Sequence, residues 1–165
     1  MRKLEKLLEQ PINALFWLAA LVTIIMMLHV VADVVGKQFF NTPIWGTLET
    51  VSGYYMVIVV FLPLAYVART EGHIIVELFT RNLPPRKLAR LDGAIGIVTL
   101  LFMGLFTWLT GLEAVTRTIQ GEVWDIADGN MIIWPSRWVL PIGAAIMTAY
   151  VLIRVIKDFR QAAGK

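Results

Sequence analysis

Residues 49–79 read ETVSGYYMVIVVFLPLAYVARTEGHIIVELF. The middle of this stretch, Val51 to Ala68, is a run of 18 residues without a charge. Such a run is about the minimum that crosses a bilayer as an α-helix, because each residue adds about 1.5 Å of rise. Ionisable side chains close both ends of the run: Glu49 precedes it, and Arg69, Glu71 and His73 follow it. The stretch therefore predicts a transmembrane helix that carries charge only near the two membrane surfaces.

The chain as a whole is too apolar for a soluble domain of its length. Of its 165 residues 58% are hydrophobic, and the mean hydropathy is +0.69. Because backbone amides in hydrocarbon need an internal partner, long apolar runs are expected to be helices. We therefore expect an all-α integral membrane protein, a single domain over residues 1–165, with four transmembrane helices at about 12–32, 48–68, 91–112 and 135–156.

The distribution of basic residues predicts the orientation of these helices. Three of the 15 Lys and Arg residues precede the first span, and one follows it. Five lie between the second and third spans, two between the third and fourth, and four near the C-terminus. Cytoplasmic segments carry the excess of Lys and Arg, so both termini are expected in the cytoplasm. The pI of about 9.4 is then a consequence of membrane topology and does not indicate a nucleic-acid-binding surface.

The segments outside the spans carry weaker signals. Residues 3–8, KLEKLL, favour one or two turns of amphipathic helix ahead of Pro11, with a frayed terminus as the alternative. A secretory signal peptide competes for residues 1–32, but the apolar run is longer than the usual 7–15 residues, so we expect a retained anchor. Loops are expected at 33–50 and 113–134, and the second is apolar enough to lie against the membrane or a partner. Within the spans, Pro63 and Pro141 are expected to kink their helices.

Several kinds of chemistry are disfavoured by the residues present. The chain has no cysteine, which excludes disulfides, thiolate metal sites and iron–sulfur clusters. His29 and His73 belong to opposite membrane surfaces, about 30 Å apart, so one haem cannot join them. The centres of the four spans hold no ionisable residue of the kind that a proton or ion relay needs. We expect no enzyme activity, no cofactor and no metal site.

The third span carries a pattern that is typical of helix packing in lipid. Small residues on one face let another backbone approach closely. The spacing of these residues places them on one stripe of a helix. The expected packing face comprises Gly93, Gly96, Gly104, Thr107 and Gly111. The sequence leaves open whether this face packs within the chain or against another chain.

Two segments resemble a known family of transporter subunits. The first is Glu49 with the apolar span after it, continuing through Phe61-Leu62-Pro63-Leu64-Ala65 to RTEGHIIVEL at residues 69–78. The second is WPSRWVLPIG at residues 134–143. Together they resemble the DctQ-type small membrane subunit of TRAP transporters, the tripartite ATP-independent periplasmic transporters. The resemblance covers nearly the whole chain.

The resemblance implies a small, non-catalytic scaffold subunit of a sodium-coupled secondary transporter in a bacterial inner membrane. Its implied partners are a larger membrane subunit, which holds the substrate and sodium sites, and a periplasmic binding protein. The binding protein would deliver an organic anion such as a C4-dicarboxylate or a sugar acid. The span ends are candidate contacts with partner subunits or lipid: Glu49, Arg69, Glu71, His73, Trp124 and Asp125. Trp124 and Asp125 are also candidates for contact with the binding protein.

Two other functions remain as alternatives. A self-sufficient homo-oligomeric transporter or channel would need polar residues that meet across a symmetry axis, and the span centres offer little beyond isolated threonines. A membrane anchor of a redox complex would be recognised by a haem absorption band, which we do not expect from this chain.

Overall fold

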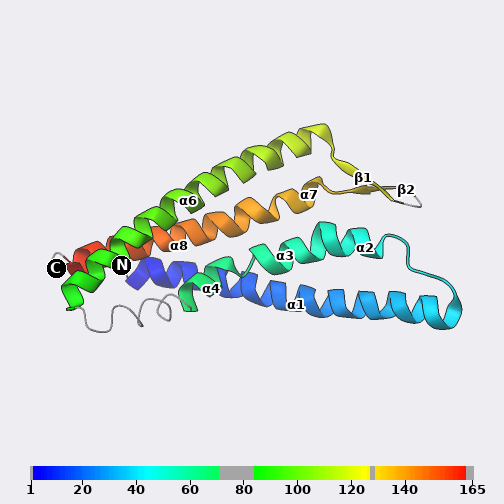
Figure 1. Ribbon diagram of the computed structural model, residues 1–165, viewed down its shortest axis with the longest axis horizontal. Coiled ribbons are helices and arrows are strands. Elements are labelled where there is room, and N and C mark those ends of the chain that lie inside the picture. Colours follow the sequence, from blue (N-terminus) through cyan, green and yellow to red (C-terminus); the bar gives the residue numbers. More distant parts are fainter. Residues whose placement is uncertain (1, 71–83, 127–128, 163–165) are drawn as a thin grey trace.

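The computed structural model describes residues 2–70, 84–126 and 129–162 of the chain. It contains four helical segments that are long and apolar enough to cross a membrane: Leu8–Phe40, Thr47–Thr70, Leu91–Gln120 and Trp134–Arg160. The expected all-α fold with four spans is therefore confirmed. Figure 1 shows the four segments running side by side along the long axis, with the N- and C-termini at the same end of the molecule. We call this end the terminal end and the opposite one the hairpin end.

The first helix is longer than expected at both ends. It is one helix, α1 (Arg2–Phe40, 39 residues), with Pro11 inside it. The helical turns expected at residues 3–8 are present as part of it, whereas the prediction of a loop beginning at residue 33 was wrong. Asp33 lies within this helix, and Lys37, one turn later, donates to its carboxylate at 2.6 Å. Beyond Phe40 the chain folds back, and the Thr42 amide donates to the carbonyl of Gly36 at 3.1 Å.

The second span is made of four short helical pieces. These are α2 (Thr47–Thr50), a π-helical turn, η1 (Val51–Tyr55), α3 (Met56–Phe61) and α4 (Leu64–Thr70). The helix is interrupted at Leu62 and Pro63, where proline has no amide to donate. The break at Pro63 that the sequence predicts is therefore present. The π-helical turn was not foreseen.

The third and fourth spans are joined by a small β-hairpin. Helix α6 (Pro85–Gln120) leads to strands β1 (Val123–Ile126) and β2 (Gly129–Ile132), which pair antiparallel. The fourth span follows as α7 (Trp134–Arg137) and α8 (Val139–Ala162), with Pro141 in the first turn of α8. The expected loop at 113–134 is thus much shorter, because α6 continues to Gln120 and the hairpin uses most of the rest.

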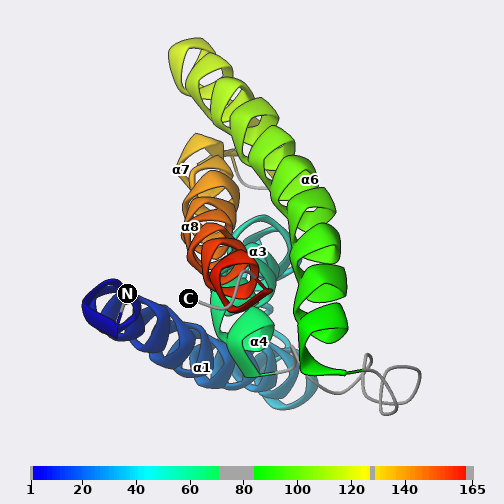
Figure 2. The ribbon, with the colours of Figure 1, turned by 90° about the vertical axis from the view of Figure 1, so that its left-hand side faces the viewer.

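Helix α8 occupies the middle of the bundle. It packs against α6 over a long interface and also contacts α1, α3 and α4. In the end-on view of Figure 2, α6 lies to one side of α8 and α1 to the other, and the long helices cross instead of running parallel. The buried apolar side chains are accordingly few and include Leu62, Ala65, Ala144, Val151 and Val155.

The interruption at Pro63 is covered by α8. A Cβ atom on Gly143 would lie 2.8 Å from the carbonyl carbon of Phe61 and closer still to its oxygen. Only glycine allows the backbone of α8 to approach the second span this closely. Gly143 therefore determines how α8 and the broken second span fit together.

Replacing Gly143 with alanine should destabilise the bundle, because the added methyl group overlaps backbone atoms that cannot rotate away. The expected loss is about 1–3 kcal/mol, the usual cost of overpacking. Thermal unfolding of the purified chain in detergent would measure it. The matched control is Gly104→Ala, since no atom lies within 4 Å of a Cβ added at Gly104. Equal unfolding temperatures for the two variants would contradict the role assigned to Gly143.

Candidate functional site

Half of the expected packing face on α6 lies against α8 at the terminal end. Cβ atoms added at Gly93 and Gly96 would meet the Phe159 ring at 3.1 Å and Val155 Cγ2 at 2.5 Å. Nearer the hairpin end, the hydroxyls of Thr107 and Thr148 share a hydrogen bond of 3.2 Å. We call this contact the α6–α8 seam. It brings two of the glycines and Thr107 together on α8 of the same chain.

The other two glycines of the face do not touch α8 closely. A Cβ at Gly104 would meet nothing within 4 Å, and one at Gly111 would reach only Pro141 Cβ at 4.0 Å. Here α6 and α8 border a groove of about 590 Å³. Its walls are almost wholly apolar and include Gly104, Trp108, Gly111, Trp138, Ala145 and Ala149. The stripe that the sequence shows as continuous is therefore closed at one end and open at the other.

A pair of side chains that the sequence analysis did not single out joins α6 to α7 across the hairpin. The Arg137 guanidinium donates through Nε and Nη2 to the two carboxylate oxygens of Glu122, at 3.0 and 2.7 Å. The Glu122 carbonyl accepts from the amides of Ile133 and Trp134 at 3.0 and 3.3 Å. Trp138 Nε1 donates to the Thr118 hydroxyl at 3.0 Å. We call the Glu122–Arg137 pair with these backbone bonds the hairpin clasp.

The end of α6 is shaped for this clasp. Gly121 has φ 63° and ψ 46°, the left-handed conformation that commonly ends a helix at glycine. The amides of Gly121 and Glu122 then donate back to Thr118 and Arg117 carbonyls at 3.2 and 3.1 Å. Hydrogen bonding to Arg137 lowers the pKa of the Glu122 carboxyl below its ordinary value of 4.5.

Trp124 and Asp125 are separated by the alternation of the strand. A Cβ on Gly53 would meet the Trp124 ring at 3.2 Å, so this side chain packs inward on the second span. Asp125 points the other way and is exposed. Of the two residues proposed for contact with a soluble partner, the exposed one is Asp125.

The predicted contact residues at the ends of the second span have different surroundings. Glu49 is partly exposed in the short helix α2 at the hairpin end. Arg69 lies in the last turn of α4 at the terminal end, and its Nη1 donates to the Asn13 side chain at 3.5 Å. Glu71 and His73 lie outside the described residues.

The π-helical turn η1 places two tyrosines on different neighbours. Tyr54 donates from its hydroxyl to the Ile132 carbonyl of the hairpin. The Tyr55 hydroxyl shares a hydrogen bond of 3.2 Å with His29 Nδ1 on α1. His29 therefore has a side-chain partner inside the chain. Within the described residues, no group of three or more His, Asp or Glu side chains is arranged to hold a metal ion.

Glu122→Gln should destabilise the fold at neutral pH by about 1 kcal/mol, because a charge-assisted bidentate pair is lost. The lowered pKa means that the carboxylate stabilises the fold above pH 4.5 and that this contribution is lost as the pH falls through the folded-state pKa. The gap in unfolding temperature between wild type and variant should thus close in acid. Glu113→Gln, which removes the exposed 2.6 Å pair with Arg117, is the control and should have a smaller effect. A gap for Glu122→Gln that widens on acidification would contradict the assignment.

Comparison with known proteins identifies the family of the chain. A family model described as "Tripartite ATP-independent periplasmic transporters, DctQ component" matches residues 26–161. No curated protein and no solved structure was found to match the chain. The matched region includes most of the four spans, the hairpin and both halves of the hairpin clasp. The chain therefore belongs to the DctQ family and is a multi-pass, non-catalytic small subunit of a TRAP transporter.

Proposed function

We propose that this chain is the static scaffold subunit of a sodium-coupled importer of an organic anion, of the C4-dicarboxylate or sugar-acid type. Membership of the DctQ family carries this proposal. The transporter's larger membrane subunit binds substrate and sodium and moves, whereas this chain widens the fixed support beside it. A periplasmic binding protein delivers the substrate, and the complex lies in the bacterial inner membrane.

The placement of charged residues favours a scaffold role for this chain over a role in conducting ions or substrate. Residues 94–112 of α6 and 139–153 of α8 contain no Asp, Glu, Lys or Arg. An ion or proton path through a membrane protein usually needs ionisable groups at such depth. Among the charged side chains with described partners, Asp33, Glu122 and Arg137 hold loops and helix ends.

The chain also leaves much apolar surface uncovered. No residue in the apolar window of the third span is buried within the chain, and Leu101, Phe102 and Trp108 are 69%, 64% and 67% exposed. On α1, Trp17 and Met27 are 70% and 61% exposed. In a membrane such surfaces contact lipid or other helices. A subunit whose task is to pack beside a larger protein has this property.

The orientation proposed for the chain follows from its basic residues. The terminal end, which holds both termini in Figure 1, is proposed to face the cytoplasm. The hairpin end then faces the periplasm, where Asp125 and Glu49 are accessible to the binding protein. This placement makes the hairpin the part of the chain that a soluble partner can reach.

Cysteine labelling tests the orientation without background, since the chain has no cysteine. Asn130→Cys in β2 should react with a membrane-impermeant maleimide in intact spheroplasts. Thr70→Cys, at the end of α4, should react only after the membrane is permeabilised. Both positions are exposed. The reverse labelling pattern would refute a cytoplasmic location of the termini.

Affinity purification tests the scaffold role. When the chain is tagged and extracted in mild detergent, a much larger polytopic membrane protein should co-purify in a fixed ratio. Proteoliposomes should transport the organic anion only when both are present together with the binding protein and a sodium gradient. A homo-oligomer of this chain that transports on its own would contradict the proposal and favour the self-sufficient transporter.

A further inference from the structure

The turn that joins α1 to α2 presents large apolar side chains at its surface. Figure 1 shows this turn at the hairpin end, where α1 reaches beyond α2. Residues 38–48 contain no Asp, Glu, Lys or Arg. Four of their side chains are between 63% and 77% exposed: Phe39, Phe40, Trp45 and Leu48. We call residues 38–48 the aromatic corner.

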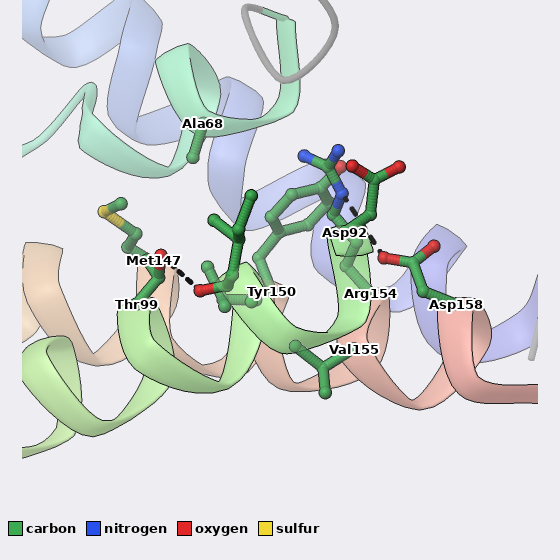
Figure 3. Close-up of a pocket in the computed structure, with 11 residues that line it drawn as sticks. Ala68, Asp92, Thr99, Met147, Tyr150, Arg154, Val155 and Asp158 are labelled. Carbon is green, nitrogen blue, oxygen red and sulfur yellow. Dashed lines mark hydrogen bonds and ion pairs between the residues drawn. The ribbon is translucent and has the colours of Figure 1, made fainter. Parts of the chain in front are cut away.

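Other surfaces at the ends of the bundle carry charge. At the terminal end, Figure 3 shows Asp92, Arg154 and Asp158 gathered on one side of a pocket between α4, α6 and α8. At the hairpin end, Asp125 is exposed on β1. A contiguous exposed apolar patch marks a contact with a membrane or with a partner, and tryptophan is enriched where a bilayer meets water. The aromatic corner therefore calls for an occupant different from that of the charged surfaces.

The backbone of the corner is bonded within the chain. The Thr42 amide donates to the Gly36 carbonyl at 3.1 Å, and Pro43 has no amide hydrogen. The Ile44 amide donates to the Asp33 carboxylate at 2.8 Å. Backbone amides in a poorly hydrated layer need such internal partners. Residues 42–44 can therefore leave water without exposing an unpaired amide.

The carboxylate beneath the corner is compensated as well. Asp33 is only 4% exposed, and Lys37 Nζ donates to it at 2.6 Å. From residue 33 to residue 48 the chain holds this one Asp and this one Lys, so the formal charges cancel. Moving an unpaired charge out of water is costly, whereas a paired and hydrogen-bonded one costs less. The segment is thus suited to a layer of low polarity.

We propose that the aromatic corner inserts into the headgroup layer of the membrane leaflet at the hairpin end, with its rings against the upper parts of the acyl chains. Transfer of the four exposed side chains out of water is favourable, and no unpaired charge opposes it. The Trp45 ring has an apolar body and one N–H donor, which suits it to the boundary between lipid and water. Insertion fixes the depth of this end of α1.

A soluble protein is a less suitable occupant of this surface. Interfaces with soluble partners combine an apolar centre with a polar rim and direct hydrogen bonds. Of the four exposed side chains, only that of Trp45 carries a hydrogen-bonding group. The amides of Thr42 and Ile44 are already used within the chain. A lipid surface asks for no directional partner at these positions.

Collisions of a nitroxide label with oxygen and with a water-soluble nickel complex test the insertion, because the chain has no cysteine of its own. Leu48→Cys in the corner and Asn130→Cys in β2 are labelled separately in the full chain, in vesicles of phosphatidylethanolamine and phosphatidylglycerol. The oxygen-to-nickel collision ratio should be several-fold higher at position 48, since oxygen concentrates in apolar surroundings. A ratio at position 48 equal to or below that at position 130 would overturn the proposal.

The same labels distinguish lipid from protein as the occupant. The measurement is repeated in vesicles that also hold the larger membrane subunit, with the binding protein added outside and inside. The ratio at position 48 should stay unchanged. A loss of collisions with both reagents when either protein is present would show that protein covers the corner, and would overturn its assignment to lipid.

A further variant tests whether the aromatic side chains hold the corner in place. Phe40→Asp, combined with the label at position 48, should lower the ratio several-fold because a carboxylate is drawn to water. Phe40→Trp should keep it. The matched control Ile119→Asp puts the same charge on a side chain that is 81% exposed near the end of α6, and it should leave the label at position 48 unaffected. A folded Phe40→Asp with an unchanged ratio would contradict the inferred insertion.

Discussion

In hydrocarbon every backbone amide and carbonyl must find its partner within the protein, and the bundle is arranged around a place where that is difficult. Pro63 cannot donate to the carbonyl one turn before it, so the second span breaks at Leu62 and Pro63. Helix α8 covers the break, and Gly143 allows its backbone to lie directly on the Phe61 carbonyl. This contact fixes the central position of α8, against which α6 and α4 then pack.

Helix α6 is held to α8 by different physical means along its length. Near the terminal end the contact is steric, with Phe159 and Val155 filling the space left by Gly93 and Gly96. In the middle, Thr107 and Thr148 add a polar contact, and at the hairpin end Glu122 and Arg137 close the connection. In lipid the hydrophobic effect does not drive helices together, so such contacts must supply the stability. The seam opens around Gly104 and Gly111, which border the apolar groove.

The architecture could be predicted from the sequence because each span is a long apolar run with few competing interpretations. The approximate positions of the four spans, and the break at Pro63, could be predicted for the same reason. The helix ends were not, because Asp33 looks like a boundary until its carboxylate is seen to accept from Lys37 and from the Ile44 amide. The hairpin clasp was also hidden, since Glu122 and Arg137 are 15 positions apart and meet only when the hairpin forms. Likewise, the spacing of the glycines shows one face but not which part of it α8 covers.

Helix α1 is longer than a bilayer is thick. The candidate span Leu8–Phe40 has 33 residues and is about 50 Å long, whereas a bilayer is about 40–45 Å thick with its headgroups. A helix longer than the bilayer is thick is accommodated by tilting, which offsets its two ends sideways in the membrane plane. The chain thus has a wider footprint in the membrane plane than four upright helices. In a thicker membrane, made of lipids with longer acyl chains, α1 would tilt less and the chain would occupy a smaller area in the membrane plane.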